Sequence, residues 1–162
     1  MDFYIATGLD NAEQANTVAS KLAARGHSLT YDWTAHGSVQ GRGDDVMRAV
    51  AKKEAQGILD ADVLVALLPG GRGTHTEIGI ALGACKPVIL YVPDPEMVDN
   101  NKDTPRTCAF YFHPLVVWAF DLQAVHTAMS MWTAMHRSRF GSEAIHPKLY
   151  AKRSKPMLLE DL

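Results

Sequence analysis

The sequence predicts an α/β protein: a flavodoxin-like, doubly wound parallel sheet of about five strands with helices on both faces. Short apolar runs alternate with segments of helical periodicity, which is the pattern of successive βαβ units. Residues 62–68 form an almost unbroken apolar run, typical of a strand buried on both faces of a parallel sheet. The chain has 162 residues, of which 47% are hydrophobic, and this suits a single domain with a substantial core.

The first predicted unit is a strand followed by a helix. Residues 3–6 are apolar, and residues 12–24 carry alanine, valine and leucine at helical spacing. Asp10 or Asn11 is placed to cap this helix, and Gly26 stands at the position that glycine favours after a helix.

The second unit has the same pattern. Residues 27–31 predict a short strand, and residues 46–59 predict a helix that Asp44 or Asp45 would cap. The predicted inner side of this helix carries Val46, Val50, Ala51 and Ile58, and the outer side carries Lys52, Lys53 and Glu54.

A polar loop at residues 32–43 joins the second strand to its helix. It contains Trp33, His36 and several glycines, and it is longer than a simple connection needs to be. We therefore predict that the loop forms a pocket wall, with Trp33 and His36 as substrate-binding residues.

The strand at residues 62–68 leads into a turn with almost no side chains, and then into a helix opened by Thr74. The unpaired N–H groups of a first helical turn form a cradle for an anion or a sugar. Glu77 lies one turn into this helix, where its carboxylate can face the bound group. The turn itself contains Pro69, Gly70, Gly71, Arg72 and Gly73.

The last third of the chain completes the sheet. Residues 87–92 predict the fourth strand, residues 94–106 a polar surface loop, residues 116–119 the fifth strand and residues 121–136 a helix. We therefore assign one domain to residues 1–136. Residues 137–162 are predicted to be a tail that is disordered or packed on a neighbouring subunit.

Composition excludes several classes of function. The formal net charge is -2, so no sequence-wide electrostatic attraction to a nucleic acid polymer or an anionic membrane is expected. Cys85 and Cys108 have no CxxC spacing, which favours reduced thiols over a disulfide or zinc site. We find no N-terminal basic region with an apolar core and no apolar run of about 18 residues, and we expect a cytoplasmic protein.

The expected strand order, 2-1-3-4-5, brings two loops together. Ligands of such sheets bind beyond the carboxyl ends of the strands, at the switch point between the first and third strands. We therefore predict a binding site between Thr7-Gly8, after the first strand, and the glycine turn after the third. The predicted substrate-binding residues are Thr7, Gly8, Gly70, Gly71, Arg72, Gly73, Thr74, His75, Trp33 and His36.

Carboxylates are the reactive groups that the site offers. The glycine turn has neither the GxxxxGK[ST] nor the GxGxxG pattern, and the chain has no G-x-S-x-G elbow. Glu77 remains, with Asp62 and Asp60 near the start of the third strand. Two carboxyl groups that flank a sugar are the groups that cleave a glycosidic bond.

These residues resemble the nucleoside 2-deoxyribosyltransferase family, which includes 2′-deoxynucleoside 5′-phosphate N-hydrolases. The resemblance covers residues 3–93 and rests on Tyr4 in the first strand, the run ADVLVALL, the glycine turn and TEIGIALG. It implies Glu77 as the nucleophile on C1′ of the sugar, Asp62 as a polar partner near the sugar or base, and Tyr4 as the residue that orients the carboxylate. It implies a nucleoside or nucleotide as partner, and no metal or other cofactor.

A second resemblance involves the same turn. Residues 69–77 are similar to the PGGxGTxxE motif of cytokinin-activating phosphoribohydrolases. Both resemblances imply cleavage of an N-glycosidic bond. The alternative from another class is a module that binds a nucleotide without converting it.

The sequence also predicts self-association. The helix at residues 121–136 carries Met129, Met131, Trp132 and Met135 on more than one face. An apolar arc of that width needs a cover, and we expect a homodimer or a larger homo-oligomer.

Overall fold

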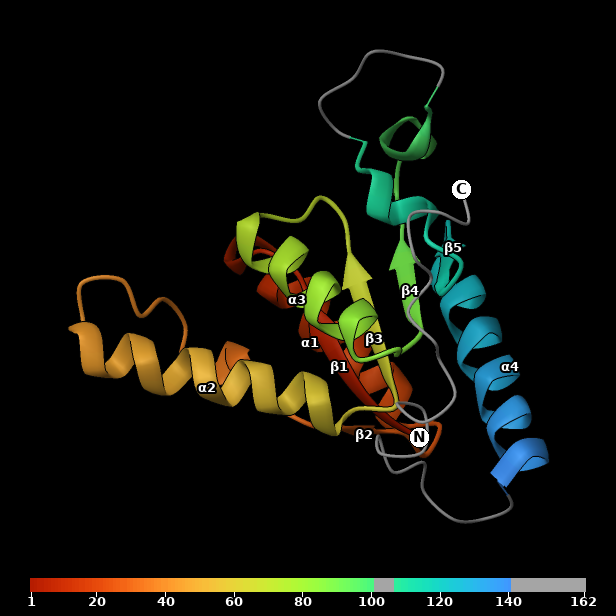
Figure 1. Ribbon diagram of the computed structural model, residues 1–162, viewed down its shortest axis with the longest axis horizontal. Helices are drawn as coiled ribbons and strands as arrows, with labels where there is room; N and C mark the ends of the chain where they lie inside the picture. Colours follow the sequence, from red (N-terminus) through yellow and green to blue (C-terminus); the bar gives the residue numbers. More distant parts are fainter. Residues whose placement is uncertain (101–106, 141–162) are drawn as a thin grey trace, which may run out of the picture.

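A computed structural model of the chain describes residues 1–100 and 107–140, with the side chains of 136–140 left out. Its sheet has five strands, all parallel, in the order β2-β1-β3-β4-β5, which confirms the predicted fold class (Figure 1). The strands are β1 (Asp2–Ala6), β2 (Ser28–Leu29), β3 (Val63–Leu67), β4 (Val88–Tyr91) and β5 (Val116–Ala119).

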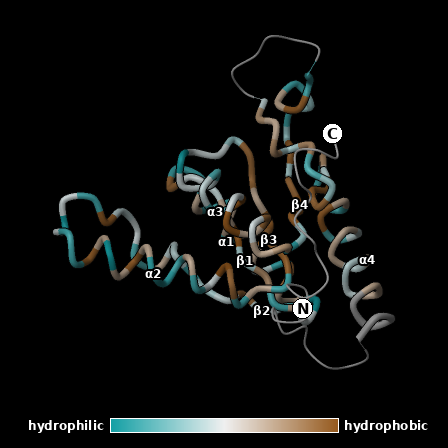
Figure 2. The backbone as a smooth tube through the Cα atoms, in the orientation of Figure 1, coloured by the Kyte–Doolittle hydropathy of each residue, from teal (hydrophilic) through white to brown (hydrophobic). Residues whose placement is uncertain are grey.

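β3 is the centre of the sheet, and its apolar sequence explains this position. Every residue of β3 is buried. On one side it pairs with β1, from Phe3 opposite Val63 to Ala6 opposite Ala66, and on the other side it pairs with β4. Val and Leu on both faces of the strand meet helices on both faces of the sheet, so the core is continuous through it (Figure 2).

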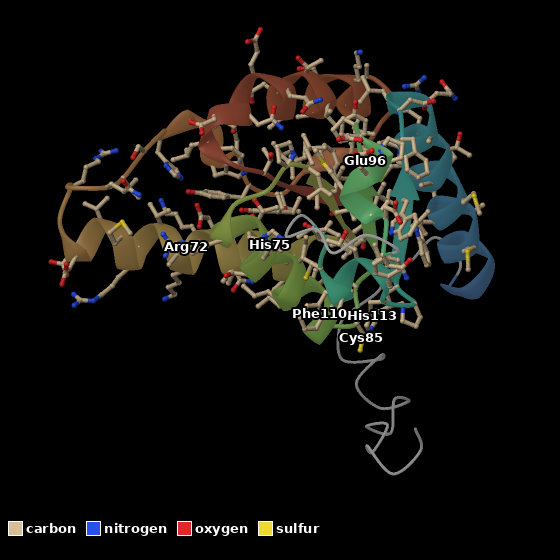
Figure 3. The ribbon with its side chains drawn as sticks, turned by 90° about the horizontal axis from the view of Figure 1, so that it is seen from above. Arg72, His75, Cys85, Glu96, Phe110 and His113 are labelled. Carbon is tan, nitrogen blue, oxygen red and sulfur yellow. The ribbon has the colours of Figure 1, made fainter. Side chains whose placement is uncertain are left out.

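Four helices surround the sheet: α1 (Ala12–Ala23), α2 (Asp44–Asp60), α3 (Arg72–Gly83) and α4 (Leu122–Phe140). α2 and α3 pack against each other and against β1 on one face, while α1 lies on the opposite face (Figures 1 and 3). α4 packs on β4 and β5. Short 3-10 turns complete the described chain: η1 (Leu9–Asn11), η2 (Trp33–Ala35), η3 (Pro95–Val98) and η4 (Ala109–Phe112).

Gly26 follows α1 with a positive φ of 82°, as predicted, but no predicted side chain caps the N-terminus of α1 or α2. Asn11 precedes α1, but its side-chain amide donates to Thr7 Oγ1 at 3.1 Å and to Gln14 Oε1 at 2.8 Å instead of capping the helix. Asp44 and Asp45 lie inside the first turn of α2, where they face the positive end of the helix dipole.

β2 is shorter than predicted because side chains replace part of its ladder. Thr30 donates through its hydroxyl to Gly57 O at 2.7 Å, and the Trp33 indole N–H donates to Ile5 O at 2.7 Å. The Trp33 bond satisfies a carbonyl of β1 that a longer strand would have paired, whereas the carbonyl that Thr30 reaches belongs to α2. Together the two bonds tie the chain after β2 to both α2 and β1.

α2 is longer than predicted, and its N-terminal half extends beyond the sheet beside the loop that follows β2 (Figure 1). Val46 and Val50 are partly buried there, and Ala51, expected on the inner side, is exposed. A cavity of about 410 Å³ lies between this half of α2 and the loop.

At the C-terminal end, α4 includes residues 137–140 of the predicted tail, and residues 141–162 lie outside the described part of the chain. No helix in the described ranges is long and apolar enough to cross a bilayer.

Candidate active site

The loops after β1 and β3 meet at the carboxyl edge of the sheet. The Thr7 hydroxyl donates to Leu67 O at 3.0 Å and is buried between the two strand ends. The structure therefore brings together the two loops that the strand order placed side by side.

The glycine turn closes tightly on the first turn of α3. A Cβ atom at Gly70 would lie 2.6 Å from Thr74 Cγ2, so a larger residue does not fit there. Gly71 is the N-cap of α3 and no side chain caps this end, which leaves backbone N–H groups facing out of the helix. Thr74 is buried, and its Oγ1 has no hydrogen-bond partner among the described residues.

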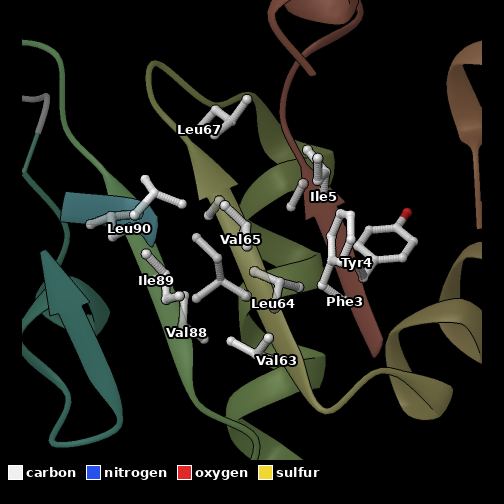
Figure 4. Close-up of a cluster of buried hydrophobic side chains, with 14 of the residues drawn as sticks. Phe3, Tyr4, Ile5, Val63, Leu64, Val65, Leu67, Val88, Ile89 and Leu90 are labelled. Carbon is white, nitrogen blue, oxygen red and sulfur yellow. The ribbon is translucent and has the colours of Figure 1, made fainter. Parts of the chain in front are cut away.

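Glu77 projects from α3 towards β1. The Tyr4 hydroxyl, on β1, donates a hydrogen bond of 2.7 Å to Glu77 Oε1. Tyr4 is fully buried, and Figure 4 shows its hydroxyl oxygen at the margin of the apolar cluster. A residue in the middle of a rigid strand therefore fixes the orientation of the Glu77 carboxylate.

Burial controls the ionisation of this pair. It raises the pKa of Glu77 to about 7, while the hydrogen bond from Tyr4 acts in the opposite direction and the charge of Glu54 adds to the rise. Burial, followed by the Glu77 charge, raises the pKa of Tyr4 far above its ordinary value. Tyr4 therefore remains protonated, and a hydrogen-bond donor, in neutral and mildly alkaline solution.

Glu54 is a second carboxyl group in this site, although the sequence pattern predicts it on the outer side of α2. It is partly buried, and burial raises its pKa, against the opposing effect of His36. Its charge also affects the pKa of Tyr4, Tyr31 and Glu77, which places it in the same electrostatic group. Glu54 lies four residues after Val50 and four before Ile58, so helical spacing puts it on the inner face of α2 with these two residues. This spacing is the sequence signal that could have identified Glu54.

Gly57 allows α2 to approach the site. A Cβ atom at this position would lie 2.6 Å from Tyr31 Cβ and 3.3 Å from the Tyr4 ring. The absence of a side chain at Gly57 therefore lets α2 lie directly against both tyrosines.

The structure does not bring Asp62 to this site. Asp62 precedes β3 and accepts a hydrogen bond of 2.8 Å from Asp2 N, at the amino edge of the sheet. Glu77 instead bonds to Tyr4, which lies in the middle of β1 and pairs with Leu64 of β3. In this position Asp62 connects the starts of β1 and β3, and its expected role as a polar partner near the sugar stays a prediction.

Trp33 and His36 both belong to the loop after β2, but of the two it is His36 that lines the cavity beside α2. Trp33 is buried and its indole N–H is used by Ile5 O, so it holds the loop in place. His36 contacts Tyr31, with ring centroids 6.1 Å apart, and lines the cavity beside α2. His36 Nδ1 bonds to Gly37 O, while Nε2 has no partner among the described residues.

Arg72 and His75 differ in their surroundings. In the view onto the carboxyl edge, Arg72 lies on the side of α2 and His75 lies towards the chain after β4 (Figure 3). Arg72 is exposed at the start of α3. His75 uses both ring nitrogens in hydrogen bonds within the protein, to Gly71 O and to the Tyr111 hydroxyl.

Comparison with known proteins agrees with this arrangement. The model of the family described as nucleoside 2-deoxyribosyltransferase matches residues 3–130. The chain belongs to the nucleoside 2-deoxyribosyltransferase family. The family is named for enzymes that transfer the 2-deoxyribosyl group of nucleosides, which are small molecules.

Among solved structures, the CMP N-glycosidase BcmB of Clostridium botulinum is similar to this member of the nucleoside 2-deoxyribosyltransferase family. The two share 16% sequence identity with a TM-score of 0.48, over 80% of this chain and 99% of that one. Among curated proteins, no sequence matches this chain significantly. Within the described residues, no group of three or more His, Cys, Asp or Glu side chains is placed to hold a metal ion.

Proposed function

We propose that this protein cleaves the N-glycosidic bond of a nucleoside or nucleoside 5′-monophosphate through a glycosyl ester on Glu77. The observation that carries the proposal is the hydrogen bond of 2.7 Å from Tyr4 to Glu77, beside the open N-terminus of α3. Membership of the family supports the same class of reaction.

In the first step, a Glu77 carboxylate oxygen forms a bond to C1′ and the bond from C1′ to the base nitrogen breaks. The base leaves with the bonding electron pair and needs a proton. Glu54 is the group that we assign as the proton donor, because its raised pKa keeps its carboxyl group protonated to a higher pH. Tyr4 holds the remaining oxygen of Glu77 in place and stabilises its charge.

In the second step, water or a second base attacks C1′ and the ester bond to Glu77 breaks. The Glu54 carboxylate accepts the proton that the attacking group loses, and Glu77 returns as a carboxylate. The protein is then ready for another turnover, so the two steps balance without a cofactor or a redox change.

The N-terminus of α3 is the proposed site for the 5′ end of the sugar. Its N–H groups, the unpaired Thr74 hydroxyl and the nearby Arg72 favour an anionic group, and a 5′-phosphate supplies one. Arg72→Ala should weaken the apparent binding of a nucleotide by about 1.5–3 kcal/mol while sparing the corresponding nucleoside. Equal losses on both substrates, measured as kcat/KM, would place Arg72 outside the 5′ subsite.

Incubation with a panel of nucleosides and nucleotides, followed by chromatography for the free base, tests the proposed activity. Glu77→Gln should lower the turnover of any substrate found by several orders of magnitude, because an amide does not form the ester. Glu13→Gln, the same change at an exposed position in the first turn of α1, serves as the control and should leave turnover unchanged. Near-normal activity of Glu77→Gln would refute the assignment of the nucleophile.

A covalent trap separates catalysis from binding alone. A 2′-fluorinated substrate analogue destabilises the oxocarbenium-like transition states, and intact mass spectrometry should then show a glycosyl increment on the wild type and none on Glu77→Gln. Binding of the panel compounds without release of base and without an adduct would instead indicate a module that senses a nucleotide.

The proposed proton donor has its own test. A base that already carries a positive charge, such as an N7-methylated purine, leaves as a neutral molecule and needs no proton. Glu54→Gln should therefore slow the release of an ordinary base by about 100-fold or more and affect the methylated one much less. Equal losses on both substrates would remove Glu54 from this role.

A further inference from the structure

No side chain at Gly71 restricts the peptide between Gly71 and Arg72. Gly71 has no side chain, and a Cβ atom built there meets nothing within 4 Å. Gly70 precedes it, and no side chain caps this end of α3. Two adjacent glycines permit rotation of the peptide that follows them, so hydrogen bonds must define its orientation.

His75 supplies the shorter of the hydrogen bonds that hold this peptide. Gly71 O accepts from His75 N at 3.2 Å and from His75 Nδ1 at 2.7 Å. A carbonyl oxygen is an acceptor, so Nδ1 must carry the proton. In the neutral ring, Nε2 is then an acceptor, and it lies 2.7 Å from the Tyr111 hydroxyl.

Tyr111 gives His75 a fixed support. It is buried in η4, its ring stacks on the imidazole with centroids 5.7 Å apart, and its carbonyl accepts from Trp118 Nε1 at 2.8 Å. Burial raises the pKa of Tyr111 to about 12, which keeps its hydroxyl protonated as a donor. A continuous path of contacts therefore runs from β5 through η4 and His75 to the glycine turn.

The direction of the Gly71 carbonyl fixes the direction of the next amide. In a planar trans peptide, the C=O bond and the N–H bond point in opposite directions. A carbonyl held towards the body of α3 therefore turns the Arg72 N–H out of the helix N-terminus, into the proposed subsite for the 5′ end of the sugar. This inference rests on the proposed function in taking that end of α3 as the substrate site.

We propose that His75 and Tyr111 are a positioning pair, which orients the Gly71–Arg72 peptide so that its N–H group binds the oxygen atoms at the 5′ end of the substrate. His75 thereby acts on the substrate through the backbone. The sequence pattern predicts direct substrate binding by His75, whereas both of its ring nitrogens have partners within the protein.

Steady-state kinetics on the best substrate of the wild type test the pair. His75→Ala should raise KM about 5- to 10-fold with kcat within about 2-fold, and Tyr111→Phe should raise KM about 2- to 3-fold. His75→Asn should recover most of the loss, because its amide N–H can replace Nδ1–H near Gly71 O. The double variant should be no worse than His75→Ala, because the two residues act through one path.

Other kinetic outcomes would overturn the proposal. A fall in kcat at unchanged KM would place His75 in the chemical step, and additive losses would separate it from Tyr111. Failure of His75→Asn to recover KM would indicate packing alone. His113→Ala is the matched control, since His113 follows η4 but bonds to Leu115 N. It should leave KM unchanged.

Nuclear magnetic resonance of the uniformly labelled protein tests the pair without a substrate. The wild type should show His75 as the Nδ1–H tautomer, and the Arg72 amide resonance should move in His75→Ala and Tyr111→Phe. If the wild type cleaves nothing in the substrate panel, the proposed function fails. The His75 and Arg72 resonances still show whether His75 and Tyr111 orient the Gly71–Arg72 peptide. An Nε2–H tautomer, or an unchanged Arg72 amide in both variants, would refute this inference.

Discussion

Tyr4 and Glu77 show two opposing effects on one carboxyl group. Burial removes water from the carboxylate and raises its pKa, while the hydrogen bond from Tyr4 stabilises the charge and lowers it. Burial is the larger effect, and the pKa lies at about 7. A nucleophile with this pKa is partly ionised at neutral pH and largely ionised in mildly alkaline solution, and it is still poorly hydrated, a state in which it is reactive.

The Tyr4 hydroxyl should therefore affect the pH dependence of the reaction. In the wild type, the acid limb of the kcat/KM profile should rise with a midpoint near 7, because the ionised form of Glu77 attacks, and kcat/KM should fall at higher pH as Glu54 loses its proton. Tyr4→Phe removes the bond that favours this form, so the midpoint should move upward by roughly one pH unit. A pH profile of kcat/KM measures the shift, and an unmoved or lower midpoint would contradict the assignment.

Glu77 should also reduce stability at alkaline pH. Its pKa is about 7 in the folded protein against an ordinary value of 4.5, so the folded state binds the proton more tightly than the unfolded chain. The resulting stabilisation is present below pH 4.5 and is lost as the pH rises through 7. Glu77→Gln should exceed the wild type in free energy of unfolding by about 1–3 kcal/mol at about pH 8, and by less at about pH 5.

Chemical denaturation at these two pH values checks the stability prediction. In Glu77→Gln, the Tyr4 hydroxyl can still donate to the oxygen of the new side-chain amide, so the variant should fold normally. A difference between the two proteins that is the same at both pH values would show that the ionisation of Glu77 does not cause it.

Individual site residues differ in how far the sequence reveals them. Glu77 follows a strand and a glycine turn, and this local pattern suffices to select it. Glu54 belongs to α2, a different helix from the one that carries Glu77. Only the packing of α2 against Tyr4 in the folded protein shows that Glu54 is part of the site. His75 lies beside Glu77 in sequence, but its partner Tyr111 belongs to another part of the fold. Hydrogen bonds between distant segments leave no local pattern.

The packing of α2 against the sheet depends on one small residue, Gly57. Gly57→Ala would place a Cβ atom 2.6 Å from Tyr31 Cβ, an atom close to the backbone that does not swing away. The helix must then move away from β1, and we expect a loss of about 1–3 kcal/mol of stability. Thermal denaturation measures the loss. Activity should fall as well, because Glu54 moves with the helix.

Gly79→Ala provides the control for a glycine within a helix. Gly79 is an exposed residue of α3, and a Cβ atom there meets nothing within 4 Å. Because alanine favours helix more than glycine does, this change should be neutral or stabilising by up to about 1 kcal/mol. If both alanine variants behave alike, helix propensity and not close packing would explain the effect at Gly57.

The order and type of the main helices and strands were predictable, but several of their ends were not. Apolar runs and helical periodicity are local properties, and β5 was predicted with the bounds that the structure shows. The caps of α1 and α2 and the length of β2 depend on which side chain reaches which backbone group. Thr30, Trp33 and Asn11 each form bonds whose partners are set by the tertiary fold.

Over the whole molecule, apolar side chains remain exposed on the side of β5 and α4. Val125, Ala128 and Met129 face the core from α4, while Met131 and Met135 are 60% and 52% exposed. The neighbouring strand and turns add further exposed apolar residues. These are Phe110, Phe112, Val117 and Phe120. Met131 and Met135 lie four residues apart on the same face of α4, and exposed apolar side chains on one helix face are typical of protein interfaces.

We therefore expect a homodimer or a larger homo-oligomer that uses the exposed face of α4. Light scattering coupled to size exclusion should give at least twice the mass of the chain at micromolar concentration. Met131→Lys combined with Met135→Lys places charges in the proposed interface, so this variant should dissociate to monomers without losing stability within the subunit. Met47→Lys, at an exposed position on α2, should leave the assembly intact. A monomeric wild type would remove the prediction, and dissociation by Met47→Lys alone would move the interface to α2.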